Sequence, residues 1–265
     1  MVDAIAGKSC VPQMNALSHR WPLGLTRRTW PLFVVGLVVL LAAIVGFDAG
    51  ASQAAIHWPA NVRAVFSIIT NFGLSDWILI PSLILFVVAA VTTRFRLRGG
   101  PKLLGAEITA IAAFVFIGVG LPGLVANLLK RIIGRGRPEL FDAVGPFGFQ
   151  NVFNDYTYQS FPSGHTTTSF AFACVIGFLW PRLFPWLLVA AVLVGFSRVP
   201  VGMHYPTDVL GGIVVGTLGA YAVRNAFAER RLLFTKKPDG RIYRRHRVLK
   251  RWLGRKVGGG TQRST

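Results

Sequence analysis

Long apolar runs separated by short polar segments make up most of this chain. A run of roughly 17 to 25 apolar residues is long enough to cross a bilayer as a helix. We expect six such helices, at 31–47, 77–93, 105–129, 166–181, 183–197 and 209–226. The pattern therefore predicts an all-α fold, a polytopic membrane protein whose six transmembrane helices pack as a bundle.

Three details of the pattern refine this picture. The segment around Pro181, Arg182 and Pro185 is expected to form a tight turn between antiparallel helices. Residues 60–72 have the pattern of a short amphipathic helix that lies along a membrane surface. The first apolar run follows a basic leader of about 30 residues, so we expect a retained helix rather than a cleaved signal peptide.

Composition agrees with a membrane protein. Of the 265 residues 52% are hydrophobic and only 15% are charged, whereas soluble domains are usually about one quarter charged. No internal repeat or low-complexity linker divides the chain. We expect a basic N-terminal segment at 1–30, one membrane domain at 31–226 and a basic C-terminal tail at 227–265.

The formal charge of +19 is distributed unevenly, and the distribution predicts the topology. Basic residues gather before the first apolar run, between the second and third, at Arg182, and in the stretch from Arg224 to the end, which holds 14 Lys or Arg. The positive-inside rule places all four segments in the cytoplasm. Both termini are then on the same side, as an even number of helices requires.

The basic tail has two interpretations, binding to nucleic acid or to anionic lipid headgroups. Tyr243, Val248, Leu249 and Trp252 lie among its charges and can enter a membrane interface. We therefore expect the tail to bind lipid headgroups and no nucleic acid.

Three polar clusters fall on the predicted outer side, at Lys130–Pro138, Pro162–His165 and Ser197–Asp208. Ionisable groups at the ends of membrane helices are candidates for function. Lys130, Arg137 and Arg198 supply fixed positive charge that suits a tetrahedral dianion. Ser163 and Gly164 lie at a helix start, where backbone N–H groups are free to bind an anion. The ligand indicated is a phosphate.

Two histidines and a carboxylate provide the means to react with that phosphate. Asp208 follows His204 by four residues and is expected to accept the Nδ1–H of the imidazole. This fixes the tautomer and leaves the other nitrogen as a nucleophile. His165 comes from a different helix start and can donate a proton to the leaving oxygen.

The three clusters together resemble the signature of the type 2 phosphatidic acid phosphatase family, whose site is shared by vanadium haloperoxidases. The matching positions are Lys130, Arg137, Pro138, Pro162, Ser163, Gly164, His165, Ser197, Arg198, His204 and Asp208. The resemblance implies a helical-bundle phosphatase core and a phosphohistidine mechanism without metal or cofactor. His204 would attack phosphorus, Asp208 would orient it, and His165 would protonate the leaving group. The other side chains and backbone donors would hold the phosphoryl oxygens.

Other interpretations use parts of the same residues. A serine hydrolase based on Ser163 lacks the G-x-S-x-G elbow. A metal site of His165, His204 and Asp208 has suitable ligand types, but the basic residues around it would repel a cation. A non-enzymatic anion or lipid transporter would use the basic vestibule without needing the His-x3-Asp pair. Haloperoxidase chemistry belongs to soluble helical proteins.

Charged residues outside the motifs are expected to be structural. Asp48, Asp76 and Glu107 lie near helix ends and are interpreted as interfacial or packing residues. Arg131 and Arg135 are interpreted as lipid-headgroup contacts or solvated charge.

The substrate expected from these features is a membrane lipid phosphate. Phosphatidate, phosphatidylglycerol phosphate, undecaprenyl pyrophosphate and a lipid A phosphate all fit, because the motifs contact only the phosphoryl group. Selectivity is expected to lie in the first three helices and in the aromatic segment 139–161. Short loops and charge bias indicate a bacterial inner membrane with the site facing the periplasm.

Overall fold

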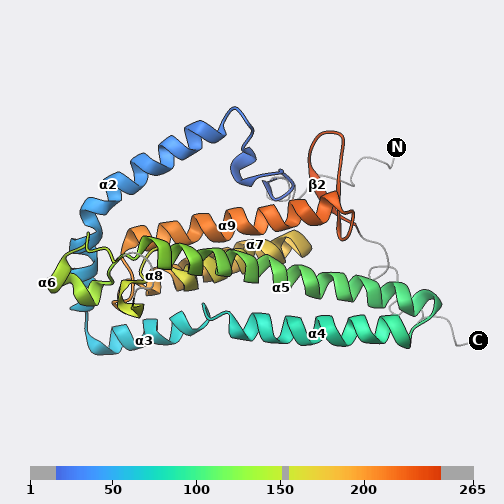
Figure 1. Ribbon diagram of the computed structural model, residues 1–265, viewed down its shortest axis with the longest axis horizontal. Helices are drawn as coiled ribbons and strands as arrows, with labels where there is room; N and C mark the ends of the chain where they lie inside the picture. Colours follow the sequence, from blue (N-terminus) through green and yellow to red (C-terminus); the bar gives the residue numbers. More distant parts are fainter. Residues whose placement is uncertain (1–15, 151–154, 246–265) are drawn as a thin grey trace, which may run out of the picture.

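The computed structural model describes residues 16–150 and 155–245. Helices make up almost all of the regular structure (Figure 1). The longer helices are α2 (Trp30–Ile56), α3 (Ala60–Asn71), α4 (Asp76–Phe95), α5 (Gly99–Ile133), α7 (Gly164–Leu179), α8 (Phe184–Ser197) and α9 (Pro206–Glu229). The short elements are η1 (Pro22–Gly24), η2 (Pro138–Leu140), α6 (Phe141–Val144), η3 (Tyr156–Tyr158), η4 (Pro181–Leu183), β1 (Phe234–Lys236) and β2 (Ile242–Arg244).

All six predicted apolar runs lie in helices, but they differ in length. Within the described residues, four stretches are long and apolar enough to cross a membrane: Trp30–Ala55, Ala60–Phe95, Gly99–Ile133 and Pro206–Glu229. The apolar helices α7 and α8 have only 16 and 14 residues, and a helix of that length rises roughly 21 to 24 Å. The chain is thus a multi-pass helical membrane protein, and the count of six crossings remains a prediction.

One local prediction from the sequence is confirmed, and a second is confirmed as to the helix while its placement along the membrane surface stays a prediction. The proline-containing segment between the fourth and fifth runs forms the short turn η4 between α7 and α8. Residues 60–71 form the separate helix α3, which packs against α8.

The centre of the bundle is formed by α5, α7 and α9, which pack against one another. Small residues on α9 allow the close approach. A Cβ added to Gly212 or Gly216 would lie 2.6 Å from the Ser163 carbonyl oxygen and 2.4 Å from the Thr167 carbonyl oxygen. Helices in membranes use such small residues to bring backbones into contact. The α7–α9 contact holds the starts of both helices together at one end of the bundle.

The outer helices are held less closely. Helices α4 and α5 form a long antiparallel pair, and α2 inclines away from the bundle (Figure 1). Almost none of α2 is buried by other parts of the protein, yet its later half contacts the start of α9 through Asp48.

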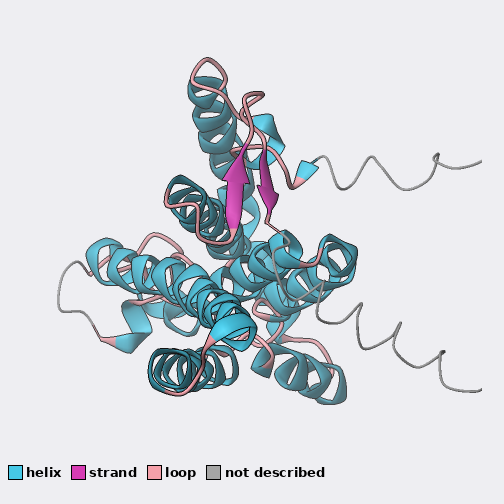
Figure 2. Ribbon diagram, turned by 90° about the vertical axis from the view of Figure 1, so that its right-hand side faces the viewer, coloured by secondary structure: helices cyan, strands magenta, loops and turns pink. Residues whose placement is uncertain are grey.

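The opposite end of the bundle is covered by the hairpin β1–β2 and by the segment around Leu17, as the second view also shows (Figure 2). The strands pair antiparallel, with Phe234 opposite Arg244. Phe234 and Ile242 are buried in the main hydrophobic core with Leu17. The part of the predicted tail from 227 to 245 is therefore not peripheral, because its apolar residues complete this core. The part of the tail from 246 onward lies outside the described residues.

Candidate active site

The three polar clusters predicted from the sequence meet at one end of the bundle. Lys130 lies in the last turn of α5, and Arg137 follows four residues after that helix ends. Ser163 is the N-cap of α7, and Gly164 and His165 form its first turn. Arg198 follows α8, while His204 and Asp208 flank the start of α9. Four helix ends thus place these side chains in one site.

Contacts between the clusters show how closely they meet. A Cβ added to Gly164 would lie only 3.2 Å from the Lys130 Nζ, so the ammonium group rests over the start of α7. His165 experiences the charges of Arg198, Lys130 and Arg137 together. Gly73, which joins α3 to α4, packs so tightly on His165 that an added Cβ would lie 2.8 Å from the His165 Cβ. The imidazole is therefore held in place from outside the motifs.

His204 is fully buried beside Asp208. Its Nδ1 lies 3.6 Å from Asp208 Oδ2, which is ion-pair range rather than the direct hydrogen bond predicted. Asp208 Oδ2 accepts hydrogen bonds from Ser160 Oγ (2.5 Å) and from the Tyr205 N–H (2.9 Å). Ser160 Oγ is also 3.5 Å from His204 Nδ1. Ser160 thus lies between the carboxylate and the imidazole, a connection that the sequence motifs do not show.

The environment of His204 favours the neutral imidazole. Burial lowers the pKa of His204 to about 3, and the neighbouring Asp208 only partly opposes this effect. A neutral imidazole has a free nitrogen lone pair and can act as a nucleophile near neutral pH.

Arg135 corrects a prediction, because it is neither solvated nor in contact with lipid headgroups. Its guanidinium is buried and donates to Asp208 Oδ1 and to Asp48 Oδ2, both at 2.8 Å. Burial acts to lower the pKa of Arg135, but Asp208 and Asp48 together raise it above its ordinary value. Arg135 thus bridges the two carboxylates and holds Asp208 through Oδ1, the oxygen other than the one nearest His204.

Asp48 completes this network from α2. The fully buried carboxylate accepts hydrogen bonds from the Thr207 N–H (3.0 Å) and from the Thr207 hydroxyl. Asp48 is buried, as its interpretation as a packing residue requires. That interpretation is incomplete, because Asp48 also accepts hydrogen bonds from Thr207, the residue next to Asp208. One feature of the sequence could have indicated this role: Asp48 is the first acidic residue after the leader and lies within an apolar helix.

The two arginines predicted to bind phosphate, Arg137 and Arg198, are held by neutral groups. Arg198 Nη1 donates to Thr70 Oγ1 of α3 (2.5 Å), while its buried Nε has no partner among the described residues. Arg137 Nε donates to the Tyr156 carbonyl, and its guanidinium lies 3.7 Å from the centre of the Tyr156 ring. Burial and the nearby charge of Arg137 lower the pKa of Arg198 to about 10. The site concentrates positive charge that a bound dianion would neutralise.

The role of Ser163 needs a correction. Its backbone N–H is not free to bind an anion, because it donates to the Asp208 carbonyl oxygen at 2.9 Å. Its hydroxyl accepts a hydrogen bond from Thr166 Oγ1 (3.0 Å). The amides of Gly164 and His165 remain at the helix start, where the first N–H groups have no partner within the helix. Ser163 thus joins α7 to α9 at the site.

A cavity of about 370 Å³ opens beside the catalytic cluster. Its lining includes Lys130, Gly164 and His165, the polar side chains of Ser75, Asn127 and Thr168, and mostly small or apolar residues of α4, α5 and the segment before α4. It gives a route between the helices to the phosphate-binding groups. Among the described residues, no three His, Cys, Asp or Glu side chains are grouped closely enough to hold a metal ion.

Comparison with known proteins identifies the family. Residues 107–232 match the PAP2 superfamily. The chain is 36% identical over 232 residues to lipid A 1-phosphatase of Rhizobium johnstonii, an alignment that covers 85% of this chain and 93% of the relative. The chain belongs to the PAP2 superfamily. It is a membrane lipid phosphatase of the PAP2 type, which confirms the resemblance found in the three motifs.

Two further matches are a second curated relative and a solved structure. Lipid A 1-phosphatase of Rhizobium etli is 36% identical over 211 residues, covering 79% of this chain and 89% of that protein. The crystal structure of a PAP2-type phosphatidylglycerolphosphate phosphatase from Bacillus subtilis is 28% identical, with a TM-score of 0.46, and covers 74% of this chain and 94% of that one.

Proposed function

We propose that this PAP2 enzyme removes a phosphate from a lipid A-type lipid through a phosphohistidine intermediate. The observation that carries the substrate class is the similarity to lipid A 1-phosphatase along almost the whole length of both chains. Relatives that act on other lipids align over less of this chain, such as the putative undecaprenyl-diphosphatase YbjG of Escherichia coli over 25% and phosphatidylglycerophosphatase B of Bacillus subtilis over 44%. The likeness to the first relative includes the helices outside the motifs, where selectivity is expected.

The first step follows from the positions of the charged groups. The phosphate enters between Lys130, Arg137 and Arg198, which neutralise its charge and align it with His204. The free nitrogen of the neutral His204 attacks phosphorus as the bond to the lipid oxygen breaks. The positive imidazolium product is stabilised by Asp208, which Arg135 and Ser160 hold in place.

His165 is assigned the transfer of protons. A bound phosphate dianion favours the protonated form of the adjacent imidazole, which donates its proton to the leaving lipid oxygen. The resulting neutral His165 then accepts a proton from water as that water attacks the phosphohistidine. Inorganic phosphate leaves, and both histidines return to their starting forms.

The arrangement of the ends supports the predicted topology. The N-terminal segment around Leu17 and the β1–β2 hairpin lie at the same end of the bundle, opposite the catalytic cluster (Figure 1). This suits six crossings, with both termini in the cytoplasm and the site on the periplasmic side of a bacterial inner membrane. The short α7 is compatible with crossing because most of its residues are buried by neighbouring helices rather than by lipid.

Phosphate release from purified lipids tests the proposal. The detergent-purified enzyme is assayed with lipid A, phosphatidate, phosphatidylglycerol phosphate and undecaprenyl pyrophosphate at equal mole fraction in mixed micelles. We expect kcat/KM to be highest for lipid A. The His204→Ala variant, assayed in the same way, should show no turnover. A tenfold preference for any of the other three lipids would refute the assigned substrate class while leaving the chemistry intact.

A further inference from the structure

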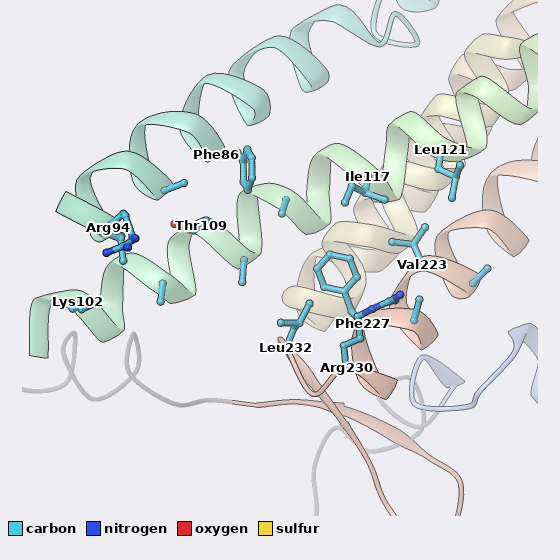
Figure 3. Close-up of a pocket in the computed structure, with 17 residues that line it drawn as sticks. Phe86, Arg94, Lys102, Thr109, Ile117, Leu121, Val223, Phe227, Arg230 and Leu232 are labelled. Atoms are coloured by element: carbon cyan, nitrogen blue, oxygen red, sulfur yellow. The ribbon is translucent and has the colours of Figure 1, made fainter. Parts of the chain in front are cut away.

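A second lipid site is indicated at the end of the bundle opposite the catalytic cluster. A groove of about 920 Å³ lies between α4, α5 and α9 (Figure 3). Twelve of its lining residues are apolar, two are threonines and three are basic, and none is acidic. The three basic residues are Arg94, Lys102 and Arg230. We propose that this groove binds one anionic phospholipid, with the headgroup at Arg94 and Lys102, an acyl chain along the helices, and Arg230 adding positive charge along the groove.

The walls of the groove explain its shape. One face of α5 presents Ala106, Ala110 and Ala113, and the facing wall of α9 presents Ala222 and Ala226. These short side chains leave a hollow that larger residues close off deeper in the groove, at Ile117 and Leu121. Figure 3 shows Phe86, Val223 and Phe227 lining it as well. An apolar surface of this kind in a membrane protein is covered by acyl chains.

The length of the groove fits one leaflet. Between Ala106 and Leu121, α5 advances fifteen residues, which corresponds to about 22 Å at 1.5 Å per residue. Half of a hydrocarbon core of about 30 Å is about 15 Å. The apolar part of the groove is therefore long enough to hold an acyl chain across a single leaflet.

The charges determine which lipid fits. Arg94 and Lys102 lie together where α4 ends and α5 begins, and Arg230 lies further along the groove, just after α9 and beside Phe227 and Leu232 (Figure 3). All three side chains are exposed, and none has an acidic partner among the described residues. The nearby Glu107 and Glu229 are paired instead with Arg244 and Arg20. The uncompensated positive charge selects an anionic headgroup over a zwitterionic one.

This site is separate from the catalytic site. The groove shares no lining residue with the cavity beside His165, and its cations lie at the opposite ends of α5 and α9 from Lys130 and Asp208. Binding there can therefore be measured without turnover, and its result does not depend on the proposed substrate.

The test uses delipidated enzyme in detergent, titrated with 1-palmitoyl-2-oleoyl-phosphatidylglycerol and, in parallel, with phosphatidylcholine of the same chains. Bound lipid is counted by native mass spectrometry, and the affinity is measured from thermal stabilisation. We expect one tightly bound phosphatidylglycerol and at least tenfold weaker binding of phosphatidylcholine. The Arg198→Gln variant should keep its affinity for phosphatidylglycerol, because that residue lies in the catalytic site.

Two pairs of variants place the lipid in the groove. Arg94→Gln/Lys102→Gln/Arg230→Gln should weaken phosphatidylglycerol binding by about 10-fold to 100-fold, since each basic residue near an anionic lipid contributes about 1 kcal/mol. The control Arg96→Gln/Arg98→Gln/Lys236→Gln removes the same charge from exposed positions outside the groove and should change binding less than about twofold. Ala222→Phe fills the groove and should also weaken binding, whereas the exposed Ala190→Phe on α8 should not.

Three results would overturn the proposal. Equal losses in the groove variants and their controls would show a general attraction to the surface. Equal affinity for the two lipids would remove the role of the cations. A dimer that Ala222→Phe dissociates, with lipid binding unchanged, would show that a second copy of the chain covers the groove.

Discussion

Two buried arginines lie near opposite ends of α9, and their partners differ in kind. Arg135 at the catalytic end binds two carboxylates, Asp48 and Asp208. Arg224 at the other end binds neutral oxygens, donating to the backbone carbonyls of Leu17 (2.5 Å) and His19 (2.6 Å). The guanidinium of Arg224 also contacts two aromatic rings, lying 4.4 Å from the centre of Phe178 and 4.5 Å from the centre of Tyr221.

The difference in partners corresponds to a difference in task. A carboxylate that accepts a charge-assisted hydrogen bond from a buried arginine is fixed in both position and charge, which suits the proposed role of Asp208 in orienting His204 and stabilising an imidazolium. Carbonyl oxygens at the end of a chain segment satisfy the arginine and at the same time attach that segment to the bundle. Arg135 therefore serves the reaction, and Arg224 serves the packing of the N-terminal segment on α9.

Substituting the two histidines at the catalytic end should cause the largest loss of activity. His204→Ala should reduce activity to background with every substrate, and it should form no acid-labile phosphoenzyme. His165→Ala should lose roughly 10² to 10⁴ in rate on a lipid monoester, a typical general-acid factor. It should keep much more of its rate on p-nitrophenyl phosphate, whose leaving group scarcely needs a proton.

The comparison requires a wild type that hydrolyses the soluble ester and variants that stay folded in detergent, checked by size-exclusion chromatography. The two roles are reversed if His165→Ala loses activity equally on both substrates while His204→Ala still forms a phosphoenzyme.

Substituting the two arginines tests the contrast between the ends directly. Arg135→Gln should lower kcat by about 10²-fold or more, because Asp208 loses a charged partner and the buried Asp48 is left unpaired, and it should also lower stability by about 3 to 5 kcal/mol. Arg224→Gln should lower the melting temperature while the kcat of the folded fraction stays within twofold of wild type. Kinetics per active enzyme, with thermal unfolding measured on the same samples, separates the two.

A purely structural Arg135 would give a different pattern. Asp48→Asn keeps a hydrogen-bonding group for Thr207 and leaves the Arg135–Asp208 pair, so its loss of kcat should be smaller than that of Arg135→Gln. Equal kcat values for the Arg135 and Arg224 variants would remove the functional distinction drawn here.

Labelling from outside the cell tests which end faces which compartment. In a background without Cys10 and Cys174, a cysteine at the exposed Gln150 should react several-fold faster with an impermeant thiol reagent in intact spheroplasts than a cysteine at the exposed Lys237. After lysis the two rates should become similar. Faster labelling of the Lys237 position in intact spheroplasts would invert the topology.

Removal of metal should have the smallest effect of all. In the proposed mechanism, Lys130, Arg137, Arg198 and backbone amides bind the phosphate without a metal. Activity in excess chelator should therefore stay within about twofold of the untreated enzyme, while vanadate, which resembles the pentacoordinate transition state, should inhibit. The control is a chelated sample with zinc or magnesium restored. Loss of activity with chelator and recovery with metal would contradict the phosphohistidine mechanism.

The sequence alone determined the parts of this protein that depend on local order. Apolar runs have a fixed length requirement in a bilayer, so all six helical segments were located correctly, although two of them are short. The three motifs have fixed internal spacing at helix ends, so the sequence could predict that His165, His204 and the cations Lys130, Arg137 and Arg198 lie at one end of the bundle, while their catalytic roles remain a proposal. The PAP2 assignment follows from the same spacing.

Only the tertiary structure decided how those local pieces are held. The hydrogen bonds from Arg135 to Asp48 and Asp208 join residues 87 and 73 positions apart, and no periodicity connects them. The Ser163 amide looked free because a helix start leaves its N–H groups open, yet the close packing of α7 on α9 brings the Asp208 carbonyl to it. Residues 233–242 read as part of a charged tail, although three of their apolar side chains complete the core. Burial arises from which helices meet, and that depends on contacts summed over the whole chain rather than on any one segment.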